Sequence, residues 1–196
     1  LVLLDFAGVA VFALTGALAA ARAKQTIITF AFFAAITGIG GGTLRDLLIG
    51  APVFWVQRPD YLLVCFGVAA VAWVVHADRW PHRALVWLDA VGMAAFAVVG
   101  AAKTLDFGLA PLVAIVMGVL TATFGGIIRD VLAGEPSMLL GPEVYISAAV
   151  VSAAVYVGLT LIGLPLLAAG VLGALSGFAL RAAAIRFNLK LPGYRR

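Results

Sequence analysis

Charged side chains are scarce in this sequence. Asp, Glu, Lys and Arg together make up 11% of its 196 residues, whereas they make up about 25% of a typical soluble domain. Hydrophobic residues make up 64% and form apolar runs of about 20 residues, the length of a helix that crosses the hydrocarbon core of a bilayer. A strict alternation of apolar and polar residues is absent, which excludes a membrane barrel. The sequence therefore predicts an all-α integral membrane protein.

Cysteine and histidine are also rare. The single cysteine, Cys65, excludes an intrachain disulfide and a cysteine-based metal site. His76 and His82 flank a short loop without the further ligands that a metal needs. The apolar runs contain no nucleophile beside a base and no unpaired carboxylate pair, so we expect no catalytic residues, no metal, no cofactor and no enzyme activity. The net charge of +4 does not indicate nucleic-acid binding, because Lys and Arg are scattered between the runs.

Short polar connections separate the apolar runs, and none is long enough to hold a soluble domain. We therefore treat residues 1–196 as a single transmembrane domain. The predicted spans, with boundaries read from the apolar runs, are residues 1–21, 26–49, 60–77, 85–103, 109–133, 143–162 and 164–187.

The first half of the chain is repeated in the second half. A shift of 84 residues aligns residues 4–61 with residues 88–145 without a gap and with 17 identities in 58 positions. The matched residues include the charged pair Arg45-Asp46, which falls on Arg129-Asp130. Shared apolar composition does not align rare charged residues, so the match indicates a duplication. We predict repeat 1 at about residues 1–77, repeat 2 at about 85–162 and a seventh helix at about 164–187.

Each repeat holds three spans, so the second copy enters the membrane from the opposite side and the two repeats are inverted. Nine Lys and Arg residues then lie on one side of the membrane and two on the other, which predicts an outer N-terminus and a cytoplasmic C-terminus. The first side holds Arg22, Lys24, Arg79, Arg83, Arg181, Arg186, Lys190, Arg195 and Arg196, and the second holds Arg58 and Lys103.

Two glycine-rich segments lie at matching positions within the second and fifth spans. Glycines weaken a helix, and irregular backbone inside a membrane is tolerated only when it is buried in protein or lines a wet cavity. Unwound carbonyls and hydroxyl groups at such positions are typical of a cation site near the midplane. The alternative is close packing between helices. The candidate pathway residues are Thr37, Gly38, Gly40, Gly41, Gly42, Thr43, Thr121, Thr123, Gly125 and Gly126.

The pairs Arg45-Asp46 and Arg129-Asp130 follow the two glycine segments. Ionisable residues inside membrane spans are candidates for function. The alternative is that the arginines extend to the interface and anchor the helix ends. Asp5 and Asp89 are expected in the first turns of their spans, where a carboxylate complements the helix dipole.

These motifs and the repeat resemble the prokaryotic branch of the trimeric intracellular cation channel family over essentially the whole chain. The most specific matching motifs are the segments 38–46 and 125–130. The resemblance implies seven transmembrane helices, kinks at the glycines of the second and fifth helices, a homotrimer, and a pathway for monovalent cations, mainly K⁺, within each protomer. The second segment departs from the glycine-rich form at Ala122 and Phe124.

Three functions remain open from the residues alone. They are a monovalent cation channel, a secondary transporter for a small solute such as glycine, and a structural or lipid-binding membrane protein. Inverted repeats with glycine-interrupted helices are common in transporters, so the preference for a channel rests on the family resemblance. The expected ligands are permeant K⁺ or Na⁺ and membrane lipid.

Overall fold

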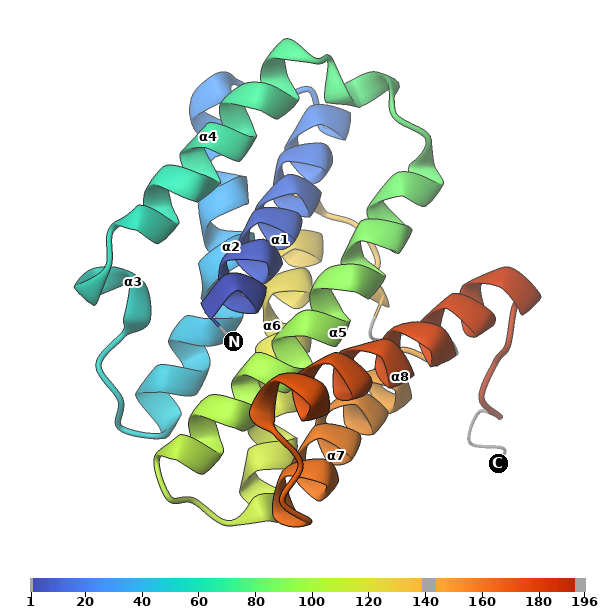
Figure 1. Cartoon of the computed structure of the whole chain (residues 1–196). Coiled ribbons are helices and arrows are strands. Elements are labelled where there is room, and N and C mark those ends of the chain that lie inside the picture. Colours follow the sequence, from blue (N-terminus) through green and yellow to red (C-terminus); the bar gives the residue numbers. More distant parts are fainter. Residues whose placement is uncertain (1, 139–143, 193–196) are drawn as a thin grey trace.

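The computed structural model describes residues 2–138 and 144–192. The helices in this part of the chain are α1 (Val2–Arg22), α2 (Ile27–Leu48), α3 (Phe54–Gln57), α4 (Asp60–Val74), η1 (Ala77–Arg79), α5 (His82–Asp106), α6 (Pro111–Ala133), α7 (Ile146–Leu161) and α8 (Leu166–Phe187). They pack into one bundle, in which α8 lies along α5 and α7 and extends beyond them (Figure 1). The fold is all-helical over the described residues, as predicted.

Within residues 2–138 and 144–192, five helices are long and apolar enough to cross a membrane, namely α1, α2, α5, α6 and α8. The third and sixth predicted spans correspond to the shorter apolar helices α4, with 15 residues, and α7, with 16. Helix α4 ends at Val74, before the predicted residue 77, and His76 then adopts a left-handed conformation with φ of 53°. The predicted start of the sixth span, Glu143, lies outside the described residues.

Local chemistry accounts for several helix ends. The hydroxyl of Thr26 accepts a hydrogen bond from the backbone N–H of Thr29 and so caps α2, as a threonine does at the residue before a helix. Pro111 opens α6, where its missing N–H costs nothing. Gly134 ends α6 with φ of +69°, a conformation that glycine adopts without strain.

The helix boundaries follow the 84-residue shift found in the sequence. Adding 84 to the bounds of α1 gives 86–106, within α5, and adding 84 to those of α2 gives 111–132, within α6. The same shift moves α4 to 144–158, which overlaps α7. Helices α1 and α5 run in opposite directions, and so do α2 and α6 (Figure 1).

The contacts between the two halves are reciprocal. The stacked rings of Phe12 and Phe96, with centroids 5.1 Å apart, are a pair related by the shift. At the crossing of α2 and α6, a Cβ added to Gly41 would collide with the carbonyl oxygen of Thr121. The related pair repeats this contact, since a Cβ on Gly125 would collide with the carbonyl oxygen of Thr37. Glycine is required at both positions because the two backbones touch there.

One expectation from the sequence is wrong. We expected the glycines to unwind the backbone and expose carbonyl ligands, but α2 is helical throughout residues 38–42 and α6 throughout residues 125–126. The carbonyls therefore remain within a regular helix. The physical reason is that the close α2–α6 contact offsets the low helix propensity of glycine. The packing alternative is the one that the structure shows at Gly41 and Gly125.

We expect the Gly41→Ala substitution to destabilise the protein by about 2 kcal/mol, because the added methyl group meets a rigid backbone carbonyl and forces α2 and α6 apart. Thermal unfolding of the purified protein in detergent measures the effect. Gly67→Ala is the matched control, since Gly67 lies inside α4 with no atom within 4 Å of an added Cβ. That control should leave stability unchanged or raise it by up to about 1 kcal/mol. Equal melting temperatures for the two variants would contradict the proposed close contact.

Candidate functional site

Two charged clusters lie near opposite ends of the bundle, each built on one Arg-Asp pair. The α2 cluster comprises Arg45, Asp46 and Lys103. The guanidinium of Arg45 contacts Oδ1 of Asp46 at 2.8 Å through both Nε and Nη2. Nζ of Lys103 lies 2.8 Å from Oδ1 and 2.9 Å from Oδ2 of the same carboxylate. Arg45 and Asp46 are buried, and Lys103 is 26% exposed.

The α6 cluster comprises Asp89, Arg129 and Asp130. Arg129 contacts Oδ1 of Asp130 at 2.8 Å through both Nε and Nη2. Its Nη1 donates to Asp89 Oδ1 at 2.7 Å and to the Thr15 hydroxyl at 3.0 Å. Arg129 and Asp89 are each only 1% exposed. One buried guanidinium thus holds two carboxylates from different helices.

Both clusters also fix the segment that follows their helix. Oδ2 of Asp46 accepts the backbone N–H of Phe54, and Oδ2 of Asp130 accepts that of Met138. Each donor lies eight residues after its carboxylate. A charge-assisted bond to a backbone N–H is among the stronger hydrogen bonds in proteins. The Arg-Asp pairs therefore tie each long helix to the connection that leaves it.

The arginines of the two pairs do not anchor the helices at the membrane interface. Arg45 is 2% exposed and Arg129 is 1% exposed, whereas a side chain that reaches the interface keeps its charged end in water. The expected position of Asp89 is also wrong. Helix α5 begins at His82, three residues before the predicted start, so Asp89 lies beyond the first turn and acts as a partner of Arg129. Asp5 does lie in the first turn of α1.

The clusters differ at two related positions. Asp5, the counterpart of Asp89, accepts a hydrogen bond of 2.7 Å from the Tyr61 hydroxyl and has no ion pair with Arg45 among the described residues. Lys103 has Ala19 as its counterpart under the 84-residue shift. The α2 cluster therefore has two cations around one carboxylate, whereas the α6 cluster has two carboxylates around one cation.

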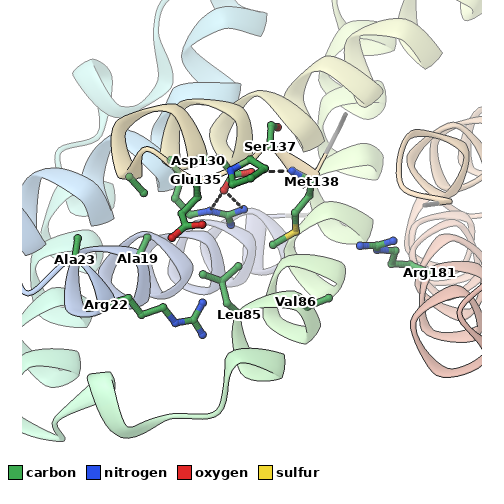
Figure 2. Close-up of a pocket in the computed structure, with 13 residues that line it drawn as sticks. Ala19, Arg22, Ala23, Leu85, Val86, Asp130, Glu135, Ser137, Met138 and Arg181 are labelled. Atoms are coloured by element: carbon green, nitrogen blue, oxygen red, sulfur yellow. Dashed lines mark hydrogen bonds and ion pairs between the residues drawn. The ribbon is translucent and has the colours of Figure 1, made fainter. Parts of the chain in front are cut away.

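A cavity of about 540 Å³ opens beside the α6 cluster where the lysine is absent. Arg129 and Asp130 form part of its wall, together with Ala19, Arg22 and Arg181. Figure 2 shows Arg22 reaching in from α1 and Arg181 from α8, with Glu135 on the segment after α6. The guanidinium of Arg181 is buried and lies 5.1 Å from the centre of the Tyr145 ring. The cavity is lined by charges of both signs.

The candidate threonines lie between the two clusters, and three of their hydroxyls bond within a helix. These bonds are Thr43 to the Ile39 carbonyl at 2.7 Å, Thr121 to Met117 at 2.6 Å and Thr123 to Val119 at 2.9 Å. Thr43 also accepts a bond from Nε1 of Trp55 at 2.9 Å. The hydroxyl of Thr37 is buried, and no hydrogen-bond partner is found for it among the described residues.

The glycines around the helix crossing have different neighbours. An added Cβ would lie 2.6 Å from the ring of Phe54 at Gly42, and 3.1 Å from the Val9 carbonyl at Gly38. The nearest atoms to a Cβ at Gly40 and at Gly126 are side-chain atoms, 3.1 Å and 3.4 Å away. Only Gly41 and Gly125 face a backbone across the α2–α6 crossing.

Lys103, Asp89 and Arg181 were not among the residues predicted from the sequence to form the site. The repeat alignment contains a signal for Lys103, because it places a lysine opposite Ala19 inside otherwise apolar matched spans. Arg181 has no counterpart in either repeat, so no such signal exists for it. No group of three His, Cys, Asp or Glu residues that could hold a metal ion occurs among the described residues.

Comparisons with known proteins agree on one family. The profile of the family described as "Glycine transporter" (Gly_transporter) matches two successive segments of the chain, residues 2–77 and 86–161. A "UPF0126 membrane protein" of Vibrio cholerae is 39% identical over 199 residues, covering 99% of this chain and 82% of the relative. The "UPF0126 inner membrane protein YadS" of Escherichia coli K12 is 38% identical over 195 residues, covering 97% and 94%.

Solved structures match over nearly the whole chain. The TRIC trimeric intracellular cation channel orthologue from Rhodobacter sphaeroides has a TM-score of 0.92 and 46% identity, covering 96% of this chain and 98% of that one. A prokaryotic TRIC channel in 0.5 M KCl has a TM-score of 0.87 and 29% identity, covering 96% and 97%. A third structure, described for conductance through TRIC cation channels, has a TM-score of 0.86 and 26% identity, covering 99% and 97%.

Proposed function

The chain belongs to the prokaryotic trimeric intracellular cation (TRIC) channel family, and from this premise we propose that it is an inner-membrane channel for cations. Its solved relatives are described as cation channels and its curated relatives include an inner membrane protein. We accordingly propose that the protein is not an enzyme. The same premise supports seven spanning helices in two inverted repeats plus α8, an outer N-terminus, a cytoplasmic C-terminus and a homotrimer.

The observation that carries the proposal is the pair of charged clusters at opposite ends of α2 and α6, with a cavity leading to one of them. We place the cation pathway between these clusters, along the glycine- and threonine-rich segments of α2 and α6. Both clusters and the cavity belong to a single chain. Each protomer of a trimer should therefore hold a pathway of its own.

The helix crossing at Gly41 and Gly125 would close the proposed pathway, because the two backbones are in contact there. At one end, the carboxylate of Asp46 already forms an ion pair with the ammonium group of Lys103. A cation that arrives from the cavity meets Asp130 while its carboxylate is paired with Arg129. Conduction thus requires α2 and α6 to separate and the ion pairs to rearrange.

Monovalent ions, K⁺ before Na⁺, are the proposed permeant species. Dehydrated divalent ions need several carboxylates or retained water, and the carboxylates Asp46 and Asp130 are each bound to an arginine. Neutral oxygens replace the hydration shell of a monovalent ion more readily, and the Thr37 hydroxyl, for which no hydrogen-bond partner is found among the described residues, is one such oxygen in the candidate segments. Entry of Ca²⁺ or Mg²⁺ should therefore be weaker than that of K⁺.

The second candidate function is transport of glycine by a carrier mechanism. It is considered because the matching family profile is described as "Glycine transporter". Flux assays in proteoliposomes separate the two candidates. A K⁺ channel releases trapped K⁺ when a K⁺ gradient is imposed, and it does not accumulate radiolabelled glycine. Saturable glycine uptake without K⁺ release would support the carrier and contradict the channel.

Placing a lysine at the related position of the α6 cluster should block the pathway. In the Ala19→Lys variant the new ammonium group enters the cavity beside Asp130, as Lys103 lies beside Asp46. We expect K⁺ flux to fall by about tenfold, because an added positive charge repels cations at the mouth. The control is Ala19→Met, which occupies similar volume without charge and should reduce flux less. Equal flux in Ala19→Lys and the wild type would mean that the cavity lies off the pathway.

A further inference from the structure

A second cavity of about 480 Å³ lies between the start of α5 and the end of α8, and its wall contains two arginines. It is lined by Arg83 and Trp87 of α5 and by Ile185 and Arg186 of α8. The rings of Trp87 and Phe178, with centroids 6.3 Å apart, join the two helices beside it. In the part of the chain that the structure describes, this cavity shares no lining residue with the one beside the α6 cluster.

The arginines of this cavity differ from the arginines that form ion pairs in the described structure. Arg45 and Arg129 are buried against carboxylates, and exposed Arg58 lies 3.8 Å from Asp60. Arg83 and Arg186 are both exposed and neither makes an ion pair within the described part of the chain. Among the described residues, no acidic side chain lines the cavity. Two guanidinium groups thus gather around one space, and the described residues provide no counter-ion there.

Apolar side chains lie next to the two arginines of this cavity. Trp87 and Ile185 contribute apolar walls, and towards the middle of the bundle α8 exposes Leu175 and α5 exposes Val91. Arg83 and Arg186 lie at the end of the molecule that carries most Lys and Arg and is predicted to face the cytoplasm. Basic pockets between transmembrane helices on that side bind anionic lipid head groups, and arginine forms paired hydrogen bonds with phosphate oxygens.

We propose that this cavity binds the head group of an anionic phospholipid. The phosphate diester lies between Arg83 and Arg186, and an acyl chain follows the apolar surface of α5 and α8. Because α8 belongs to neither repeat, the lipid would hold this additional helix against the first helix of repeat 2. The proposal depends on the membrane location of the chain and does not depend on the ion that it conducts.

The test measures the melting temperature of the protein in nanodiscs of phosphatidylcholine alone and of phosphatidylcholine with phosphatidylglycerol. We expect phosphatidylglycerol to raise the melting temperature of the wild type. The double variant Arg83→Gln/Arg186→Gln should lose most of this rise, and native mass spectrometry should show about tenfold less retained phosphatidylglycerol. The control is Arg79→Gln, which removes one exposed charge at the same end without lining the cavity and should retain the lipid.

The variant Arg83→Lys/Arg186→Lys guards against a general loss of folding. It preserves both charges but not the paired geometry, so it should fold as the wild type does and retain less lipid. Equal lipid retention in the wild type and both double variants would overturn the proposal and leave the arginines as interfacial anchors. Stabilisation by soluble glycerophosphate to the same extent as by the lipid would also overturn it, since the site would then bind a free phosphate.

Discussion

Replacing Arg129 with glutamine is expected to cost about 3 to 5 kcal/mol of folding stability, the largest loss of any single substitution considered for this protein. The reason is that Asp89 and Asp130 then remain buried near each other without their shared cation. Unpaired buried carboxylates lose their hydration and also repel each other. Thermal unfolding in detergent, supported by the yield of folded protein, measures the effect.

Arg58→Gln is the control for the loss of an arginine ion pair. Its partner Asp60 is 61% exposed and 3.8 Å away, so the change should be below about 1 kcal/mol. A second variant tests the cause, because Arg129→Gln combined with Asp89→Asn removes one of the stranded charges and should recover part of the loss. If Arg129→Gln were as stable as Arg58→Gln, the α6 cluster would not be the buried network that the structure describes.

Replacing Lys103 with alanine is expected to raise cation current by about 2- to 10-fold. The substitution removes the ammonium group from Asp46 and recreates the arrangement of the related end, where Ala19 leaves a cavity. The α2 cluster then carries one positive charge less and attracts cations more strongly. Electrical recording from purified protein in a planar bilayer gives the current.

Lys103→Arg serves as the control, since it retains a cation near Asp46 and should leave the current close to that of the wild type. The stability of Lys103→Ala should fall only modestly, because Arg45 still neutralises Asp46 at 2.8 Å. Unchanged current in a well-folded Lys103→Ala protein would show that the ammonium group does not obstruct the pathway.

Much of the fold was predictable from the sequence because two strong signals agree. The length of the apolar runs fixes the helices, and the 84-residue repeat fixes their correspondence, as the bounds of α2 and α6 show. The sequence also identified both Arg-Asp pairs. Apolar runs and repeats can be read along the sequence without knowing which segments contact each other, so they predict the helices directly.

The contacts between segments were harder to predict. A glycine at position 41 is compatible with an unwound helix and with close helix packing, so the sequence alone does not distinguish the two. The position of the Thr121 carbonyl, which an added Cβ would meet, identifies close packing. Arg129 was open to an anchoring role until its bond to Asp89, 40 residues earlier, placed it in the interior. The cavity beside it depends on an alanine at position 19, a residue that carries no chemical signal by itself.

This chain is expected to form a cation-selective channel, and single-channel recording across a KCl gradient tests that function most directly. Purified wild-type protein in a planar bilayer should give discrete current steps whose reversal potential lies close to that of K⁺. Replacing K⁺ with Ca²⁺ on one side should shift the reversal potential in the direction of weaker Ca²⁺ entry. A reversal potential near that of Cl⁻, or the absence of steps from protein that accumulates glycine, would contradict the account.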